Sequence, residues 1–204
     1  MHFSWHGTTC VKIQTKPFDK DITIVLDPYK PTKGQFPRSL TPDIGLYSRG
    51  EKNSITLSGK PFTLSMPGEC ETKGVLIAAS QSPEENKIIF RIDSEQMSVG
   101  FLGLLNKEPN DDNLSLLNGV DILIIPVGGK DCYDAEKAVK VVNTVEPRIV
   151  IPIAFKSEND PNFADVDKFL KEIGSKNGKP EKKIIIKKKD LPQDETRVEV
   201  LSKE

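Results

Sequence analysis

The sequence predicts an α/β fold in which mixed β-sheets carry helices on the outside. The first observation is the stretch from Val120 to Phe155, where two apolar runs flank a helical pattern. The first run, 120–127, is too short to span a membrane and is bounded by Gly128 and Gly129, as expected of a strand buried on both faces. The second observation is that strand patterns dominate the first half of the chain, before this βαβ unit. Together these observations favour one domain over residues 1–204.

The βαβ unit also predicts where a binding site would lie. Asp134 is a suitable N-cap for the central helix, and apolar residues follow it at helical spacing. Pro147 ends this helix, because the residue before a proline is pushed out of the α region. In open α/β sheets, ligands bind beyond the carboxyl ends of the strands. We therefore expect any site at the loops 127–132 and 153–156.

The other elements are assigned from apolar alternation, turn residues and helical spacing. Lysines flank the last two strands, which we interpret as edge strands because lysine discourages edge-to-edge pairing. The segment 97–105 is apolar and contains two glycines. The expected strands are 2–14 with a turn at 7–9, 22–26, 43–47, 55–64, 75–79, 87–92, 182–189 and 196–201, and the expected flanking helices are 114–117 and 166–173.

Composition excludes several classes of protein. The net charge of −1 provides no footprint for nucleic acid or an anionic membrane. No apolar run approaches the roughly 20 residues of a membrane helix, and the N-terminus lacks the features of a signal peptide. We therefore expect a cytoplasmic protein. The three scattered cysteines, Cys10, Cys70 and Cys132, suggest reduced thiols and no disulfide framework.

Five sequence motifs, in this order, resemble those of a known family. They are Trp5–Cys10 (WHGTTC), Ile24–Pro28 (IVLDP), Pro67–Glu71 (PGECE), Ile122–Gly129 (ILIIPVGG) and Ile149–Ile153 (IVIPI). Together they resemble the metallo-β-lactamase fold superfamily, in particular its small bacterial zinc-dependent hydrolases, a group that includes the ascorbate-phosphate lactonases. The resemblance covers nearly the whole chain and implies a four-layer αββα sandwich of two mixed sheets with the site at one rim. Because members of this family often form oligomers, the resemblance also suggests a homo-oligomer that forms through the C-terminal strands.

The metal-ligand motifs of that family are lost here. The resemblance implies a His-x-His-x-Asp-His motif, a bridging Asp after a glycine and a final His after the last buried strand. A histidine is also often found where this chain has Thr8, and another would be expected within 80–84, where there is none. The vestigial metal-site positions are Arg49, Glu51, Asn53 and Ser54 in the motif, Phe101 at the bridging position and Ala154 at the final position.

These replacements argue against zinc. A catalytic zinc needs neutral imidazoles and a carboxylate around one open position. Arg49 is a permanent cation that would repel a divalent ion, and Phe101 is a bulky apolar residue. We therefore expect no metal and no other cofactor. The first functional hypothesis is a non-catalytic pseudo-hydrolase that acts as a binding or assembly module.

The alternative is a metal-independent or residual hydrolase of the ester, lactone or phosphoester class. Cys132 precedes a helix N-terminus and follows Lys130 by two residues, and both features favour a thiolate. The rim carboxylates Glu51 and Asp131 are the other candidates, although Asp131 is more simply interpreted as a capping residue.

Two weaker ligand sites are also considered. His2 and His6 lie four apart and would share one face of a strand, where two imidazoles make at best a weak metal site. Arg49 with Lys52, and Lys130 with Lys156, would line a rim that holds an anion. In both cases the simpler interpretation is structural, namely hydrogen-bonded strand residues and solvated loop charges.

Overall fold

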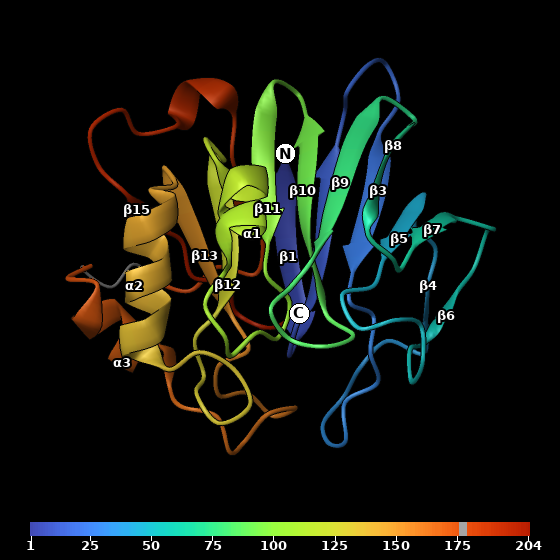
Figure 1. Ribbon diagram of the computed structural model, residues 1–204. Coiled ribbons are helices and arrows are strands. Elements are labelled where there is room, and N and C mark those ends of the chain that lie inside the picture. Colours follow the sequence, from blue (N-terminus) through green and yellow to red (C-terminus); the bar gives the residue numbers. More distant parts are fainter. Residues whose placement is uncertain (176–178) are drawn as a thin grey trace.

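Two mixed β-sheets lie face to face in the computed structural model, which describes residues 1–175 and 179–204 (Figure 1). The first sheet has the order β14 (Ile184–Ile185), β1 (His2–Gly7), β2 (Cys10–Thr15), β3 (Ile22–Leu26), β5 (Ile44–Leu46) and β7 (Phe62–Leu64). The second has the order β15 (Arg197–Val198), β13 (Ile149–Ile153), β12 (Ile122–Pro126), β11 (Met97–Phe101), β10 (Ile88–Ser94), β9 (Val75–Gln81) and β8 (Gly68–Thr72). A separate pair joins β4 (Ser39–Leu40) to β6 (Thr56–Leu57).

The predicted βαβ unit is confirmed. Strands β12 and β13 pair in parallel, and the helix α2 (Ala135–Val145) connects them. The Asp134 side chain caps this helix by accepting a hydrogen bond from the Lys137 amide at 2.9 Å. At the other end, Glu146 adopts a left-handed conformation immediately before Pro147. Local sequence thus fixes both the start and the end of α2.

The core fills the space between the two sheets. Alternate residues of β1 and β2, such as Phe3, Trp5 and Ile13, are buried there against residues of the second sheet, including Phe90 and Phe101. Strands β12 and β13 are buried on both faces, as their unbroken apolar runs predicted. Their second face is covered by helices.

All the α-helices of the described residues follow β11. Helix α1 (Asp111–Leu117) packs on β9 and β10, α2 packs on β12, and α3 (Val166–Glu172) packs on α2. The predicted mixed sheets and their flanking helices are therefore confirmed. On the first sheet, however, the described residues place the β4–β6 pair next to β5, where the Leu57 side chain occupies the space beside Gly45. The outer layer on this side is therefore built from strands and loops.

The last two strands are edge strands, as predicted, but each belongs to a different sheet. They are shorter than expected, and the 3-10 helix η1 (Lys188–Asp190) interrupts the segment between them. The chain thus crosses from one sheet to the other. Among the residues that the structure describes, no helix combines the length and the apolar character needed to cross a bilayer.

Candidate functional site

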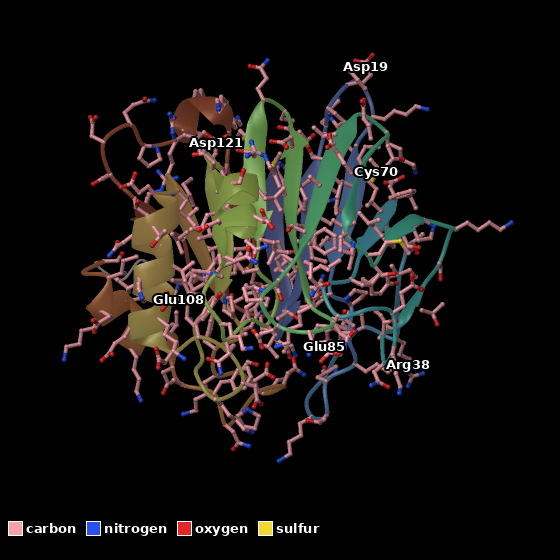
Figure 2. The ribbon with its side chains drawn as sticks, viewed as in Figure 1. Asp19, Arg38, Cys70, Glu85, Glu108 and Asp121 are labelled. Carbon is pink, nitrogen blue, oxygen red and sulfur yellow. The ribbon has the colours of Figure 1, made fainter. Side chains whose placement is uncertain are left out.

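A pocket of about 360 Å³ opens at the end of the sandwich where the loops after β1, β3, β5, β12 and β13 gather. In Figure 2 this is the end that carries Arg38 and Glu85, whereas Asp19 and Asp121 lie at the opposite end. We call it the rim pocket. It is lined by Thr8, Thr9, Asp27, Tyr29, Lys30, Pro31, Thr32, Lys33, Arg49, Leu104, Lys130, Asp131, Asn159, Asp160, Pro161, Asn162 and Phe163.

Asp27, directly after β3, forms the base of the rim pocket. It is 1% exposed and accepts hydrogen bonds from the amide and the Oγ of Ser48, both at 2.6 Å. Burial raises the pKa of the Asp27 carboxyl, while the Arg49 guanidinium and the Ser48 hydrogen bonds oppose that rise. Gly103 approaches the same pair, because a Cβ there would lie 2.5 Å from Ser48 Oγ. Asp27 therefore ties the loop after β5 to the end of β3.

Arg49 is held against the ring of Tyr29. Its guanidinium carbon lies 4.4 Å from the ring centroid, which is the distance of a cation–π contact. The Tyr29 hydroxyl accepts a hydrogen bond from the Arg49 amide at 2.7 Å and donates one to the Gly50 carbonyl at 2.8 Å. Burial raises the pKa of this phenol, so it stays neutral. The ring is thus a fixed platform for the arginine.

The opposite wall comes from the loops after β1 and β13. The Asp160 carboxyl accepts hydrogen bonds from the Thr8 amide at 3.0 Å and from Thr8 Oγ1 at 2.9 Å. Burial raises the pKa of Asp160, and the Thr8 hydrogen bonds oppose the rise. An apolar cluster continues this wall and consists of Leu104, Cys132, Ala154 and Phe163.

Left-handed backbone occurs at this rim as well as at turns elsewhere in the fold. Four non-glycine residues here have positive φ: Thr8 at 44°, Asp27 at 47°, Lys130 at 61° and Ala154 at 51°. Such conformations are costly for residues with a Cβ, and they recur at functional sites. The rim is therefore one of the places where the chain accepts backbone strain.

The vestigial metal positions separate into two groups. Arg49 lines the rim pocket, and Ala154 packs behind it with Leu104 and Phe163. Phe101 is fully buried, belongs to the main core and is not among the residues that line the rim pocket.

The other three vestigial positions lie outside the lining of the rim pocket. Glu51 and Asn53 are exposed, and Ser54 donates a hydrogen bond to the Glu51 carbonyl at 2.7 Å. Of the four residues in the altered His-x-His-x-Asp-His motif, only Arg49 therefore faces the rim pocket.

A family profile described as "Beta-lactamase superfamily domain" matches residues 2–154. The chain belongs to the beta-lactamase superfamily. This beta-lactamase superfamily member is also 33% identical, over 54 residues, to the UPF0173 protein PF0020 of Pyrococcus furiosus. That match spans 26% of this chain and only 24% of the Pyrococcus protein.

Solved structures confirm the metallo-β-lactamase fold of this superfamily member. A Thermotoga maritima protein, proposed to be a zinc-dependent hydrolase of the metallo-β-lactamase superfamily, matches with a TM-score of 0.80 at 23% identity, over 98% of this chain and 100% of that chain. Igni18, a metallo hydrolase of Ignicoccus hospitalis, matches with a TM-score of 0.66 at 12% identity, over 91% and 99%. The metallo-β-lactamase fold protein YhfI of Bacillus subtilis matches with a TM-score of 0.63 at 10% identity, over 98% and 95%.

The side chains of this superfamily member do not fit a catalytic zinc. Such a site needs several imidazole, thiolate or carboxylate ligands around one point. Within the part of the chain that the structure describes, no three His, Cys, Asp or Glu side chains are grouped so that they could hold a metal ion. At the rim, the guanidinium of Arg49 lies beside the Asp27 carboxyl, the buried acid in that pocket.

The alternative in which Cys132 is an activated nucleophile is not favoured by the surroundings of this residue. Its thiol is 2% exposed and donates a hydrogen bond to the Gly129 carbonyl at 3.3 Å. Burial raises the pKa of Cys132 to about 12, although contacts with the Gly128 and Gly129 backbone oppose the rise. Desolvation thus outweighs the backbone contacts and the charge of Lys87, which lower the pKa of this thiol.

We expect a thiol reagent near neutral pH to label Cys132 much more slowly than Cys70, which lies half-buried on the edge strand β8. The physical reason is that the nucleophile is the thiolate, which burial disfavours. A labelling time course followed by peptide mass spectrometry measures both rates in one sample. Labelling of Cys132 as fast as a free peptide thiol would contradict this assignment and would restore the cysteine hydrolase.

The remaining candidates are not assembled into a catalytic group. Asp131 lines the rim pocket, but Glu51 does not; it accepts a hydrogen bond from Ser65 Oγ at 3.4 Å. His6 is buried on β1, with its Nε2 at 3.7 Å from Glu204 Oε2, and burial lowers its pKa. His2 lies on the same strand, and its pKa is also lowered, mainly by burial.

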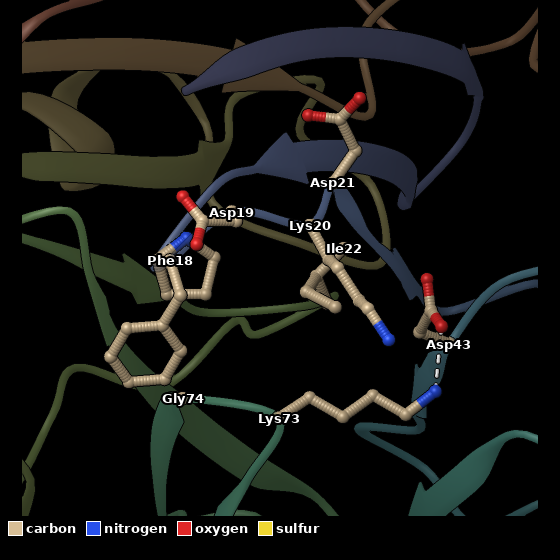
Figure 3. Close-up of a pocket in the computed structure, with 9 residues that line it drawn as sticks. Phe18, Asp19, Lys20, Asp21, Ile22, Asp43, Lys73 and Gly74 are labelled. Atoms are coloured by element: carbon tan, nitrogen blue, oxygen red, sulfur yellow. Dashed lines mark hydrogen bonds and ion pairs between the residues drawn. The ribbon is translucent and has the colours of Figure 1, made fainter.

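A second cavity, of about 580 Å³, lies far from the rim between the β2–β3 and β8–β9 turns (Figure 3). The Phe18 ring is 73% exposed there and occupies the space above Gly74. Lys73 donates to the Asp43 carboxylate at 2.6 Å across the floor. None of the vestigial metal positions lines this cavity.

Several rim residues escaped prediction from the sequence. Tyr29, Ser48 and Asp160 gave no local signal, because each acquires its role only when distant loops meet. Asp27 gave a partial signal, since an acidic residue directly after a buried strand is unusual.

Proposed function

We propose that this protein is a non-catalytic member of the superfamily, a binding module that works without zinc. The observation that supports the proposal is the position of Arg49. At the place of the first histidine of the family motif, a permanent cation lies on the Tyr29 ring in the rim pocket. A divalent ion would meet a like charge there.

The hydrolase alternative receives no comparable support. A metal-independent mechanism needs an activated nucleophile or a pair of carboxylates placed around a substrate. The Cys132 thiol is buried with a raised pKa, and Glu51 lies outside the pocket that contains Asp131. The retained pocket is therefore better suited to holding a ligand than to cleaving one.

Metal titration tests the proposal. We expect the purified protein to contain far less than one equivalent of zinc or manganese, and its melting temperature to stay unchanged when either metal is added. A bound metal at a hundredfold excess over its Kd would instead raise the free energy of unfolding by about 2.7 kcal/mol. About one equivalent of metal retained at the rim of the natural protein would overturn the proposal.

A further inference from the structure

The Arg49 side chain is a charged group of the rim pocket with an unpaired hydrogen-bond donor. Its Nε is shielded from solvent and has no hydrogen-bond partner among the described residues. Nor does Arg49 belong to any ion pair within 4.0 Å in that part of the chain. A guanidinium presents a planar fork of five N–H donors, and a buried donor without a partner is destabilising. Such a group is suited to an acceptor from outside the chain.

The nearest acid does not satisfy this fork. Both oxygens of the Asp27 carboxyl already accept hydrogen bonds from Ser48, each at 2.6 Å. Among the described residues no hydrogen bond or ion pair within 4.0 Å joins the Arg49 side chain to Asp27, so Arg49 acts on Asp27 through its charge, which opposes the rise in the Asp27 pKa. Asp160, on the opposite wall, is likewise bound to the amide and the hydroxyl of Thr8.

The lining has a small excess of positive charge. Besides Arg49, the lysines Lys30, Lys33 and Lys130 line the pocket, whereas its acids are Asp27, Asp131 and Asp160. The lining thus has four cationic side chains and three carboxyl groups, an excess of one positive charge that one negative charge would balance. Leu104 and Phe163 add apolar surface to the lining. The pocket, at about 360 Å³, is near the lower limit for small-molecule sites.

We propose that the rim pocket binds a small organic monocarboxylate, with the carboxylate on the Arg49 fork and the apolar body against Leu104 and Phe163. This inference rests on the proposed binding function and names its ligand class. A guanidinium binds a carboxylate through two parallel hydrogen bonds, and stacking on Tyr29 fixes the plane of the fork in advance. The single excess charge matches a monoanion better than a phosphate dianion.

Three probes of similar size test the proposal: benzoate, its neutral analogue benzamide, and phenyl phosphate. Each is titrated into the metal-free protein at neutral pH, and binding is followed by amide chemical shifts in NMR. We expect saturable binding of benzoate, with shifts centred on Ser48, Gly50 and Gly103. Benzamide should bind at least about tenfold more weakly, because it lacks the charge that the fork recognises.

Two variants test whether benzoate binding needs the planar guanidinium fork of Arg49 or only its positive charge. R49K keeps the positive charge but loses the planar fork, so we expect it to weaken benzoate binding about tenfold or more. K52Q changes a cation on the same loop that lies outside the pocket, and it should bind benzoate as the natural protein does. Unchanged dispersion of the amide spectrum verifies that R49K is folded.

Three results would overturn the carboxylate assignment: equal binding of benzoate and benzamide, R49K binding benzoate as tightly as the natural chain, or tighter binding of phenyl phosphate than of benzoate. Each of them leaves the zinc-free binding module intact, since that proposal fails only if metal is held at the rim. The two proposals can therefore be rejected separately.

Discussion

Replacing Asp27 with alanine should lower the free energy of unfolding by about 2–4 kcal/mol, because the buried amide and hydroxyl of Ser48 would both lose their acceptor. Relief of the desolvated carboxyl offsets part of this cost. The loop after β5 would lose its tie to β3, so the Arg49 platform should loosen as well. Chemical denaturation measures the stability, and amide exchange at Ser48 measures the local loosening.

D27N is the matched control, because asparagine tolerates left-handed backbone and still offers one acceptor. The smaller loss expected for D27N should depend on pH. Since burial holds the folded pKa of Asp27 above its ordinary value of 3.8, the natural protein gains stability from this group at low pH and loses that gain as pH rises through the folded pKa. The gap between the natural chain and D27N should therefore narrow as pH increases. If D27A proved as stable as the natural chain, Asp27 would not hold the rim together.

Gly128→Ala should be at least as damaging, with an expected loss of about 3 kcal/mol or more. A Cβ at Gly128 would overlap the Ala154 carbonyl oxygen and lie 2.9 Å from the Phe163 side chain. Because a backbone atom at the end of β13 cannot move as a flexible side chain does, the two rim loops would have to separate. Thermal unfolding measures the loss.

Gly119→Ala serves as the comparison. A Cβ at Gly119 would meet open space, and the only obstacle to alanine there is the left-handed φ of +68°. It should cost about 1–2 kcal/mol through backbone strain alone. Equal stability of the two variants would mean that the contact between the loops after β12 and β13 contributes little.

The sequence predicted the parts of the fold that depend on neighbouring residues. Helix α2 could be bounded by Asp134 and Pro147, since capping and proline geometry act within one turn. The strands β12 and β13 were recognisable because an apolar run of that length, bounded by turn residues, is typical of a doubly buried strand. Parallel pairing followed from the connecting helix.

The rim pocket depended on contacts that no local pattern encodes. Ser48 and Asp27 are 21 positions apart, and Thr8 and Asp160 are 152 apart. Cys132 had the sequence features of an activated thiol, but packing against Leu104 and Ala154 removed it from water. Burial is a property of the assembled loops, and it reversed the direction of the pKa shift that charge and helix position implied.

The left-handed residues at the rim have a further consequence for recognition. Strand ends from both sheets hold Thr8, Asp27 and Ala154 in their unusual conformations. The cavity is thus shaped by the ends of strands from both sheets. A guest would find the walls already in place and would lose little affinity to ordering the chain. Such a cavity can exchange one occupant for another over evolution while its architecture stays the same.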